Sequence, residues 1–138
     1  MKPSRKDQVK KLEREILFNS IQSKEGIHEL VLVLDHLKAG FNIAKIIRTA
    51  EIFSLSGIHI IGTKEFNPFP AKGAIRRVPL KFLDKVEDSI TELQNRGYTI
   101  YTLDTHTDNF LHRSKIPKKS AFIFGNEETG LSIPSNFA

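Results

Sequence analysis

Two glycines and two carboxylates near the C-terminus form the stretch of this sequence best suited to holding a small ligand. Residues 121–124 are apolar, and Gly125, Glu127, Glu128 and Gly130 follow at once. The apolar run is too short for a helix, so the pattern predicts a buried strand that opens into a tight loop. Glycines let a ligand approach the backbone, and carboxylates accept hydrogen bonds from a hydroxylated or cationic one. An ordinary turn with solvated acids would show the same residues, so this loop alone leaves its function open.

A second stretch with chemical potential begins at Asn42. Apolar residues follow it at helical spacing, which predicts a helix over residues 42–53 with Asn42 as its N-cap and Arg48 on its outer face. A helix N-terminus at the ligand-binding edge of a sheet suits a phosphate or a carboxylate. The alternative is that Asn42 only caps the helix and Arg48 only solvates it.

The connection spanning residues 63–80 combines cations with aromatic rings. Its cations and phenylalanines are Lys64, Lys72, Arg76, Arg77, Phe66 and Phe69. Phosphates pair with cations and bases stack on exposed rings, so this composition suits single-stranded nucleic acid. The two phenylalanines fit equally well as plugs at the edge of the core. A loop of this length inside a compact domain is usually functional.

The elements that must position these stretches alternate along the chain. Strands are expected at residues 29–34, 58–62, 98–103 and 121–124, and helices at 42–53 and 84–96. Asp84 and Glu87 have capping-box spacing, and Gly57 and Gly97 are expected to end the two helices. This alternation predicts one α/β domain, a parallel sheet with flanking helices, over residues 27–138. Residues 1–26 are expected to form an amphipathic helical extension, with apolar positions at Val9, Leu12, Ile16 and Leu17.

Composition narrows the partners and the compartment. The chain has 138 residues, no cysteine and a formal net charge of +5, with a pI near 9.5. The lack of cysteine excludes disulfides and thiolate metal sites, and the five histidines show no metal-ligand spacing, so no metal is expected. No apolar run could span a membrane and no signal peptide is visible, so a cytoplasmic protein is expected. The charge favours a polyanion such as RNA, although a solvated basic surface explains it as well.

Together, two of these stretches resemble the first two sequence motifs of the SpoU/TrmH family, RNA ribose 2′-O-methyltransferases of the SPOUT superfamily. The matching residues are Asn42-x5-Arg48-Thr-Ala-Glu51-x-Phe53 and Phe124-Gly125-Asn126-Glu127-x-x-Gly130-Leu131-Ser132. Both motifs occur in the family's order at fitting distances, and the resemblance covers the chain from about Leu30 to its end. Ala44 stands where the family usually has glycine.

The resemblance implies a SPOUT-type α/β knot, S-adenosylmethionine as methyl donor, and a homodimer that acts on tRNA or rRNA. The cofactor-binding residues that it implies are Leu103, Gly125, Glu127, Gly130 and Leu131. The catalytic residues that it implies are Asn42, Arg48 and Glu127. Because a guanidinium is a poor base, we expect Arg48 to hold the target phosphate and to stabilise developing alkoxide charge. The basic loop, through Lys64, Lys72, Arg76 and Arg77, would bind the RNA.

One part of the family pattern is missing. The third motif, an Ile-x-x-Pro stretch followed by Ser-Leu-Asn, should begin shortly after Ser132, but the sequence ends at Ala138. We therefore expect an incomplete knot, and a fragment of a longer methyltransferase rather than a naturally shortened one. The alternative function is a catalytically incomplete RNA-binding module of the same fold. A flavodoxin-like nucleotide-binding domain is disfavoured, because no phosphate-binding glycine-rich loop follows the first strand.

Overall fold

The computed structural model describes residues 2–8, 10–11, 14, 24–63 and 65–133. Its strands are β1 (His28–Asp35), β2 (Leu55–Ile61), β3 (Leu80–Leu83), β4 (Thr99–Thr102) and β5 (Ser120–Phe124). Its helices are α2 (Asn42–Ile52) and α3 (Val86–Asn95), together with the 3₁₀ helices η1 (Phe69–Arg76) and η2 (Leu111–Arg113). Residues 5–8, 10–11 and 14 are helical. The apolar positions that predicted an N-terminal helix, at residues 9, 12, 16 and 17, lie outside the described residues.

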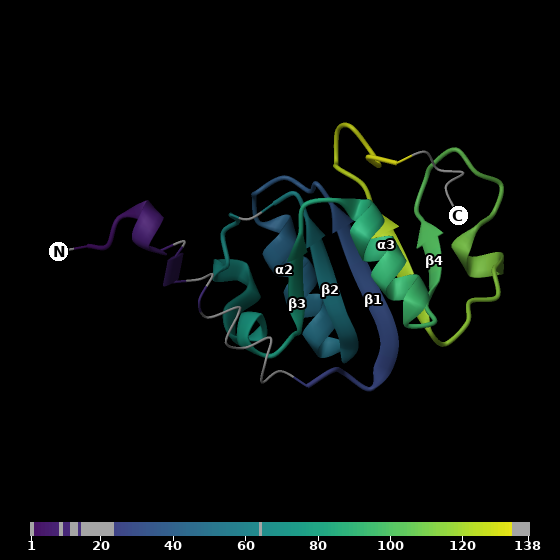
Figure 1. The fold of residues 1–138 in the computed structure, drawn as a ribbon, viewed down its shortest axis with the longest axis horizontal. Helices are drawn as coiled ribbons and strands as arrows, with labels where there is room; N and C mark the ends of the chain where they lie inside the picture. The colour runs from purple at the N-terminus through teal and green to yellow at the C-terminus, as the bar shows by residue number, and fades with distance from the viewer. Residues whose placement is uncertain (1, 9, 12–13, 15–23, 64, 134–138) are drawn as a thin grey trace.

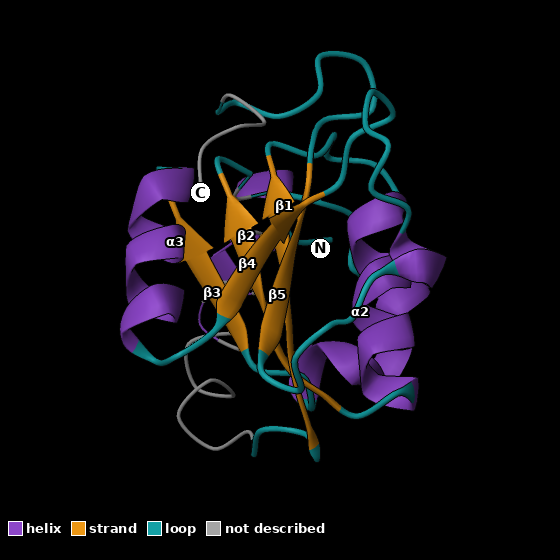
Figure 2. Cartoon of the chain, turned by 90° about the vertical axis from the view of Figure 1, so that its right-hand side faces the viewer, coloured by secondary structure: helices purple, strands orange, loops and turns teal. Residues whose placement is uncertain are grey.

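The five strands form one parallel sheet in the order β3-β2-β1-β5-β4 (Figure 1). Leu34 near the end of β1 pairs with Ile60 on one side and with Phe124 on the other. Figure 2 shows α2 on one face of the sheet and α3 on the other. The predicted α/β class is therefore confirmed. Since β1 and β5 are neighbours, the loops that follow them leave the same edge side by side, where ligands of such sheets bind.

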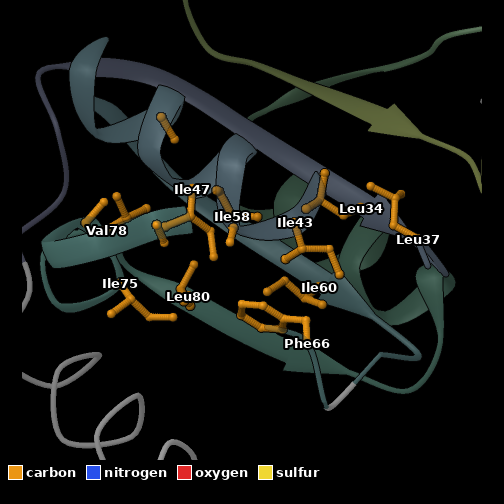
Figure 3. Close-up of a cluster of buried hydrophobic side chains, with 14 of the residues drawn as sticks. Leu34, Leu37, Ile43, Ile47, Ile58, Ile60, Phe66, Ile75, Val78 and Leu80 are labelled. Atoms are coloured by element: carbon orange, nitrogen blue, oxygen red, sulfur yellow. The ribbon is translucent and has the colours of Figure 1, made fainter. Parts of the chain in front are cut away.

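The larger core lies between α2, η1 and one face of the sheet. Ile43 and Ile47 of α2 pack with Ile60 of β2 in this cluster (Figure 3). These buried positions recur at helical spacing, so their burial explains why the segment is helical and why Arg48 is left exposed on its outer face. Each such aliphatic side chain stabilises the fold by about 1.5–3 kcal/mol when fully buried.

A second core lies on the opposite face, under α3. Ile90 and Leu93 of α3 pack here with Val33 of β1 and Ile123 of β5. Ile133, which is 6% exposed, joins the same cluster after the loop that follows β5. The loop is therefore anchored at both ends, by strand β5 at its start and by the α3-side core at its finish.

The connection between β2 and α3 is more regular than expected. The prediction of an irregular segment over residues 63–80 is wrong, because η1 occupies residues 69–76 of it. The prediction also missed β3, which pairs in parallel with Ile58–Ile61 of β2. β3 is a four-residue edge strand in which only Leu80 is buried, so its sequence carries too short an apolar pattern to be recognised. In η1, Lys72 has φ 49°, a kink that interrupts helical periodicity.

Both predicted helix starts are wrong in detail. Asn42 is the first helical residue of α2, and the N-cap position belongs to Phe41. The N-cap of α3 is Lys85 rather than Asp84, and no side-chain hydrogen bond caps that helix. Residues that favour caps also favour other short-range or tertiary hydrogen bonds. In α2 a tertiary bond takes the side chain of Asn42 away from a capping role.

One of the two predicted helix ends is correct. Gly97 follows α3 with φ 87°, a conformation in which glycine carries no Cβ penalty, so its role as the stop of that helix is confirmed. Gly57 does not end α2, because it lies inside the buried strand β2. There a Cβ would come within 3.0 Å of the carbonyl oxygen of Pro79. The turn after α2 is made by Ser54, which has φ 53°.

Candidate active site

The loops after β1 and β5 are joined through Asn126. Its Nδ2 donates a hydrogen bond of 2.8 Å to the carbonyl oxygen of His36, in the β1 loop. Its Oδ1 accepts hydrogen bonds from the backbone N–H groups of Glu128, at 2.8 Å, and Thr129, at 3.0 Å. One amide side chain thus shapes the turn after β5 and ties it to the β1 loop. Asn126 is part of the second motif, but no sequence pattern indicated that its side chain would join the two loops.

The glycines of the β5 loop let it close on itself. Asn126 and Gly130 exchange two backbone hydrogen bonds of 2.9 Å each. A Cβ on Gly125 would lie only 2.4 Å from the carbonyl carbon of Gly130, so position 125 has no room for a side chain. Gly130 itself has φ 76° but open space around it. Gly125, which was expected to let a ligand approach the backbone, is therefore required for the close packing of the loop's own backbone.

Glu127 lies where the two motifs meet. Its Oε1 accepts a hydrogen bond of 3.3 Å from Nδ2 of Asn42, and its Oε2 accepts one of 3.2 Å from the backbone N–H of Lys38. Burial, the largest single influence, raises the pKa of Glu127. The hydrogen bonds from its own backbone N–H, Lys38 and Asn42, with the charge of Lys38, outweigh burial and lower that pKa below its ordinary value. The carboxylate is therefore ionised at neutral pH.

The neighbouring acid has a different partner. Nζ of Lys38 forms an ion pair with Glu128 on the exposed side of the loop. Lys38 therefore contacts both glutamates, one through its backbone and one through its side chain. Because the pair is solvent-exposed, it contributes little stability, roughly 0–1 kcal/mol. Glu128 is thus paired with Lys38, and Glu127 is the carboxylate that faces Asn42.

A buried carboxylate fixes the far end of the loop. Asp35, the last residue of β1, is fully buried. Its Oδ2 accepts a hydrogen bond of 2.6 Å from the backbone N–H of Ser132, and its Oδ1 accepts one of 2.8 Å from the Ser132 hydroxyl. Nδ1 of His36 lies 2.7 Å from Oδ1. Sequence reasoning missed Asp35, although a charged residue at the end of an otherwise apolar strand was a usable signal.

The structure does not bring Arg48 to Glu127. Along α2, Arg48 lies about 9 Å beyond Asn42 and is rotated from it by about 120° around the helix axis. Its side chain is exposed, and none of the described residues pairs with its guanidinium. Asn42 thus faces the β5 loop, whereas Arg48 faces solvent, where it is available to an external anion such as a phosphate.

Leu103 lies at a cavity on the other side of β5. Its N–H donates a hydrogen bond of 3.1 Å to the carbonyl oxygen of Ile123, just after β4 ends. Leu103 lines a cavity of about 790 Å³. The other lining residues are 100–102, 104–107, 109–111, 114, 116 and Phe122. The rings of Tyr101 and Phe122 stack there with centroids 5.4 Å apart. Aromatic rings with a few polar groups suit a nucleoside. The described residues of the glycine loop do not line this cavity, and Leu131 packs instead with the α3-side core.

The predicted RNA-binding residues divide in the structure. Lys72 and Arg76 are exposed on η1, and Lys64 lies outside the described residues. Arg77 forms an ion pair with Glu51 of α2, a contact that raises the pKa of its guanidinium. Phe66 is buried in the larger core, whereas Phe69 is 83% exposed. The open question about the two phenylalanines therefore has a different answer for each ring.

Neither a metal-binding cluster nor a membrane-spanning helix occurs among the described residues. Among those residues, no group of three or more histidine, cysteine or acidic side chains could hold a metal ion. No helix described there is long and apolar enough to cross a membrane.

His59 is buried, with Nδ1 2.6 Å from the hydroxyl of Ser89. His59 of β2 and Ser89 of α3 therefore form a buried contact between the sheet and this helix.

Comparison with known proteins places the chain in one family. The model of the SpoU rRNA Methylase family matches residues 29–134. The tRNA (guanosine(18)-2'-O)-methyltransferase of Borreliella burgdorferi is 32% identical over 107 residues, which cover 75% of this chain and 49% of that protein. The TrmH/SpoU tRNA modifying enzyme of A. aeolicus superposes with a TM-score of 0.67 at 23% identity, over 92% of this chain and 64% of that one.

A structure of an rRNA methyltransferase with AdoMet bound, from Sinorhizobium meliloti, superposes with a TM-score of 0.65 at 22% identity, over 82% of this chain and 45% of that one. These structural matches show a shared fold. The chain spans about half or less of the length of the curated relatives it matches. Since the family model covers most of the sequence and both of its motifs meet at one sheet edge, the chain belongs to the SpoU rRNA methylase family.

Proposed function

We propose that this chain is an S-adenosylmethionine-dependent methyltransferase domain that methylates a ribose 2′-hydroxyl of tRNA or rRNA. The observation that carries the proposal is the hydrogen bond between Asn42 and Glu127, which joins the two family motifs at the ligand-binding edge of the sheet. The Borreliella burgdorferi relative, a tRNA (guanosine(18)-2'-O)-methyltransferase, supports the ribose 2′-hydroxyl as the acceptor. Family membership also supports a cytoplasmic SPOUT-type domain over residues 27–138 and a homodimer of the full-length protein.

The cofactor fits what the described residues offer. Leu103 would contact the adenosine part in its aromatic-lined cavity, which at about 790 Å³ has room for a nucleoside. Gly125, Glu127, Gly130 and Leu131 do not line that cavity, and are proposed to contact the remainder of the cofactor from the loop after β5. The S. meliloti structure supports AdoMet as the ligand of this fold. S-adenosylmethionine supplies the methyl group when bound. Every other task belongs to side chains of the protein.

The side chains at the β1 and β5 edge would align and polarise the ribose. Because Asn42 donates its Nδ2 hydrogen to Glu127, its Oδ1 remains free to accept a hydrogen bond from a ribose hydroxyl. Glu127, whose pKa is lowered, would fix that orientation as an anion. Arg48 would bind the target phosphate and stabilise charge that develops on the 2′-oxygen, since it remains protonated. Alignment of this kind is the main contribution of a protein to a transfer reaction.

The RNA would reach this edge over η1. The exposed cations Lys72 and Arg76 would meet phosphates, and Lys64 is proposed to do the same. Arg77 is tied to Glu51, so it would present a fixed charge from the junction of η1 and α2. The contacts between η1 and α2 would keep this basic surface in register with Arg48.

The test is methyl transfer from labelled S-adenosylmethionine to unmodified tRNA and rRNA, followed by alkaline hydrolysis. A 2′-O-methylated ribose blocks cleavage of its own phosphodiester, so labelled dinucleotides are expected. Arg48→Ala should lower the rate by about 10²-fold or more, the size of effect seen when one charge-stabilising group is removed. Lys45→Ala, which removes an exposed cation from the same helix, is the control and should be nearly neutral.

Label found on a base instead of a ribose would contradict the proposed acceptor. Binding of RNA with no methyl transfer and no binding of S-adenosylhomocysteine would favour the alternative function, an RNA-binding module that lacks a working cofactor site. Titration of the longer protein, where one exists, with S-adenosylhomocysteine would then distinguish two cases. Either the cofactor pocket is incomplete in this chain, or the protein has no cofactor pocket.

A further inference from the structure

Phe69, the first residue of η1, is the most exposed phenylalanine among the described residues. The ring is 83% exposed, whereas Phe66, three residues earlier, is 7% exposed and packs in the larger core (Figure 3). Exposing a phenylalanine ring to water is unfavourable relative to burying it. The free protein therefore presents an apolar surface whose burial would require a ligand.

The backbone that carries this ring is restrained. Pro68 is the N-cap of η1 and Pro70 follows Phe69, so rigid residues flank it on both sides. Oδ1 of Asn67 accepts a hydrogen bond of 2.9 Å from the N–H of Phe69, and the carbonyl oxygen of Pro68 accepts one of 3.0 Å from the N–H of Ala71. Because the backbone is already ordered, only the side-chain torsions of Phe69 lose entropy when a planar ligand stacks on its ring.

A cavity of about 540 Å³ lies beside the residues that precede the ring. Phe69 itself does not line it; the described residues that do include Asn67, Pro68, Ala39 from the β1 loop, Arg5, Gln8, Glu65 and Phe66. Ala39 follows Lys38, whose backbone N–H binds Glu127. The cavity thus lies between the N-terminal segment, the β1 loop and the residues before η1. Its described lining offers one cation, one carboxylate and two amides, which match the edge of a nucleobase or a ribose better than they match a phosphate.

The charges around the Phe69 ring indicate the class of ligand that it would bind. The exposed cations Lys72 and Arg76 lie on η1 with Phe69, and the chain carries a formal net charge of +5. An exposed aromatic ring beside cations is the combination that binds unpaired nucleotides, with rings stacking on bases and cations meeting phosphates. Duplex RNA keeps its bases stacked inside the helix and offers no free base face to such a ring.

We infer that Phe69 is a stacking residue for an unpaired RNA base, and that the adjoining cavity receives the nucleotide between that base and the active site. This inference rests on the proposed function, because it concerns the same RNA. It assigns the substrate to single-stranded or looped RNA around the target ribose. It also gives η1 two separable tasks, a charge contact through its cations and a base contact through Phe69.

The experiment compares Phe69→Ala with the matched variant Phe53→Ala, which truncates a ring that is 63% exposed after the far end of α2. Binding of a labelled, unstructured RNA oligonucleotide is followed by fluorescence anisotropy across a salt series. Phe69→Ala should weaken binding about tenfold, the scale of one lost base stack, with the salt dependence unchanged because no cation is removed. Phe53→Ala and the wild type should bind equally, and Phe69→Trp should bind at least as tightly as the wild type.

A second measurement separates stacking from a structural effect of the substitution. An oligonucleotide scanned with single abasic sites should bind the wild type more weakly at one position, and that difference should disappear in Phe69→Ala. Equal binding by Phe69→Ala and wild type, or an equal loss in Phe53→Ala, would overturn the inference, as would equal loss of affinity for a duplex.

Methyl transfer distinguishes this failure from failure of the proposed function. If the inference is correct, Phe69→Ala raises KM for RNA and leaves kcat nearly unchanged. Active wild-type protein with an unchanged KM in Phe69→Ala would overturn the stacking role alone. Stack-dependent binding by a wild type that transfers no methyl group would overturn the proposed function alone.

Discussion

Nδ2 of Asn42 donates a 3.3 Å hydrogen bond to Oε1 of Glu127, across 85 residues of sequence. The contact depends on the sheet order, since only the adjacency of β1 and β5 brings the start of α2 beside the loop after β5. Two motifs that are far apart in the chain therefore form one edge of one site.

Replacement of Glu127 by glutamine tests that contact. Glu127→Gln keeps the shape but removes the charge that orients Asn42, and the new amide can turn a donor toward Nδ2. We expect kcat to fall by about 10²-fold with little change in the affinity for RNA. Steady-state methyl transfer measures both quantities. Glu128→Gln, which alters only the exposed pair with Lys38, is the control, and an equal loss in that variant would show that Glu127 has no special role.

Asp35→Asn should weaken the closure of the β5 loop. The buried carboxylate accepts two hydrogen bonds from Ser132, and an amide can offer only one oxygen. We expect the free energy of unfolding to fall by about 1–3 kcal/mol, because a buried donor loses its partner. Urea denaturation measures this loss. Ser132→Ala removes only the hydroxyl bond and should cost about 1 kcal/mol, so a larger loss in Ser132→Ala than in Asp35→Asn would contradict the role given to the carboxylate.

The two loop glycines should respond differently to alanine. In Gly125→Ala the new Cβ would lie 2.4 Å from the backbone of Gly130, so the loop must open and binding of S-adenosylhomocysteine should be lost. Gly130→Ala meets open space and carries only the cost of a positive φ, about 1–2 kcal/mol. Calorimetric titration and thermal unfolding of both variants check this ranking. A better-binding Gly125→Ala protein would show that the loop has another conformation when it is functional.

The stability of the fold should decline in mild acid because of His59. Burial lowers the pKa of His59 to about 4, opposed by the charge of Glu92 and assisted by Lys81 and Arg96. The unfolded chain takes up a proton near pH 6.5, whereas the folded chain does so only near pH 4. The free energy of unfolding should therefore be level above about pH 6.5 and fall between pH 6.5 and 4, by up to about 3 kcal/mol.

The variant His59→Gln isolates this effect. It removes the titrating ring but keeps a polar group near the hydroxyl of Ser89. Urea midpoints measured from pH 7.5 to 4 should then show a much smaller slope than in the wild type, whatever the absolute stability of the variant. Lowered pKa values of Glu92 and Glu127 contribute in the same direction, but only at the acidic end of the series. An equal slope in both proteins would assign the acid sensitivity to those carboxylates.

The sequence was most informative where periodicity was strong or motifs were long. α2, α3 and the central strands have apolar patterns that follow from burial on one or both faces, so their type and order were predictable. β3 was not, because an edge strand with one buried residue leaves almost no pattern. Asn42 shows a different limit, since a residue that can cap a helix gives no sign that a distant carboxylate will take its side chain.

Two residues of the candidate site could be named from the sequence motifs, but the residues that tie its loops together could not. Glu127 and Asn42 follow from the motifs, whereas the ties made by Asp35 and Asn126 depend on which strands are neighbours. Strand order cannot be read from local patterns. The same applies to Phe66 and Phe69. They are the same residue type in one connection, but only Phe66 packs in the core with α2 and β2.

The place of β5 in the sheet also sets the order in which the protein can be completed during synthesis. Among the described strands β5 is synthesised last, yet it lies between β1 and β4, and β4 pairs with no other strand of the described sheet. A nascent chain that has reached β4 therefore still exposes one unpaired edge of β1. Such an edge is a template for pairing with other chains. Newly made protein should consequently depend on a chaperone until residues 120–124 have been synthesised and inserted.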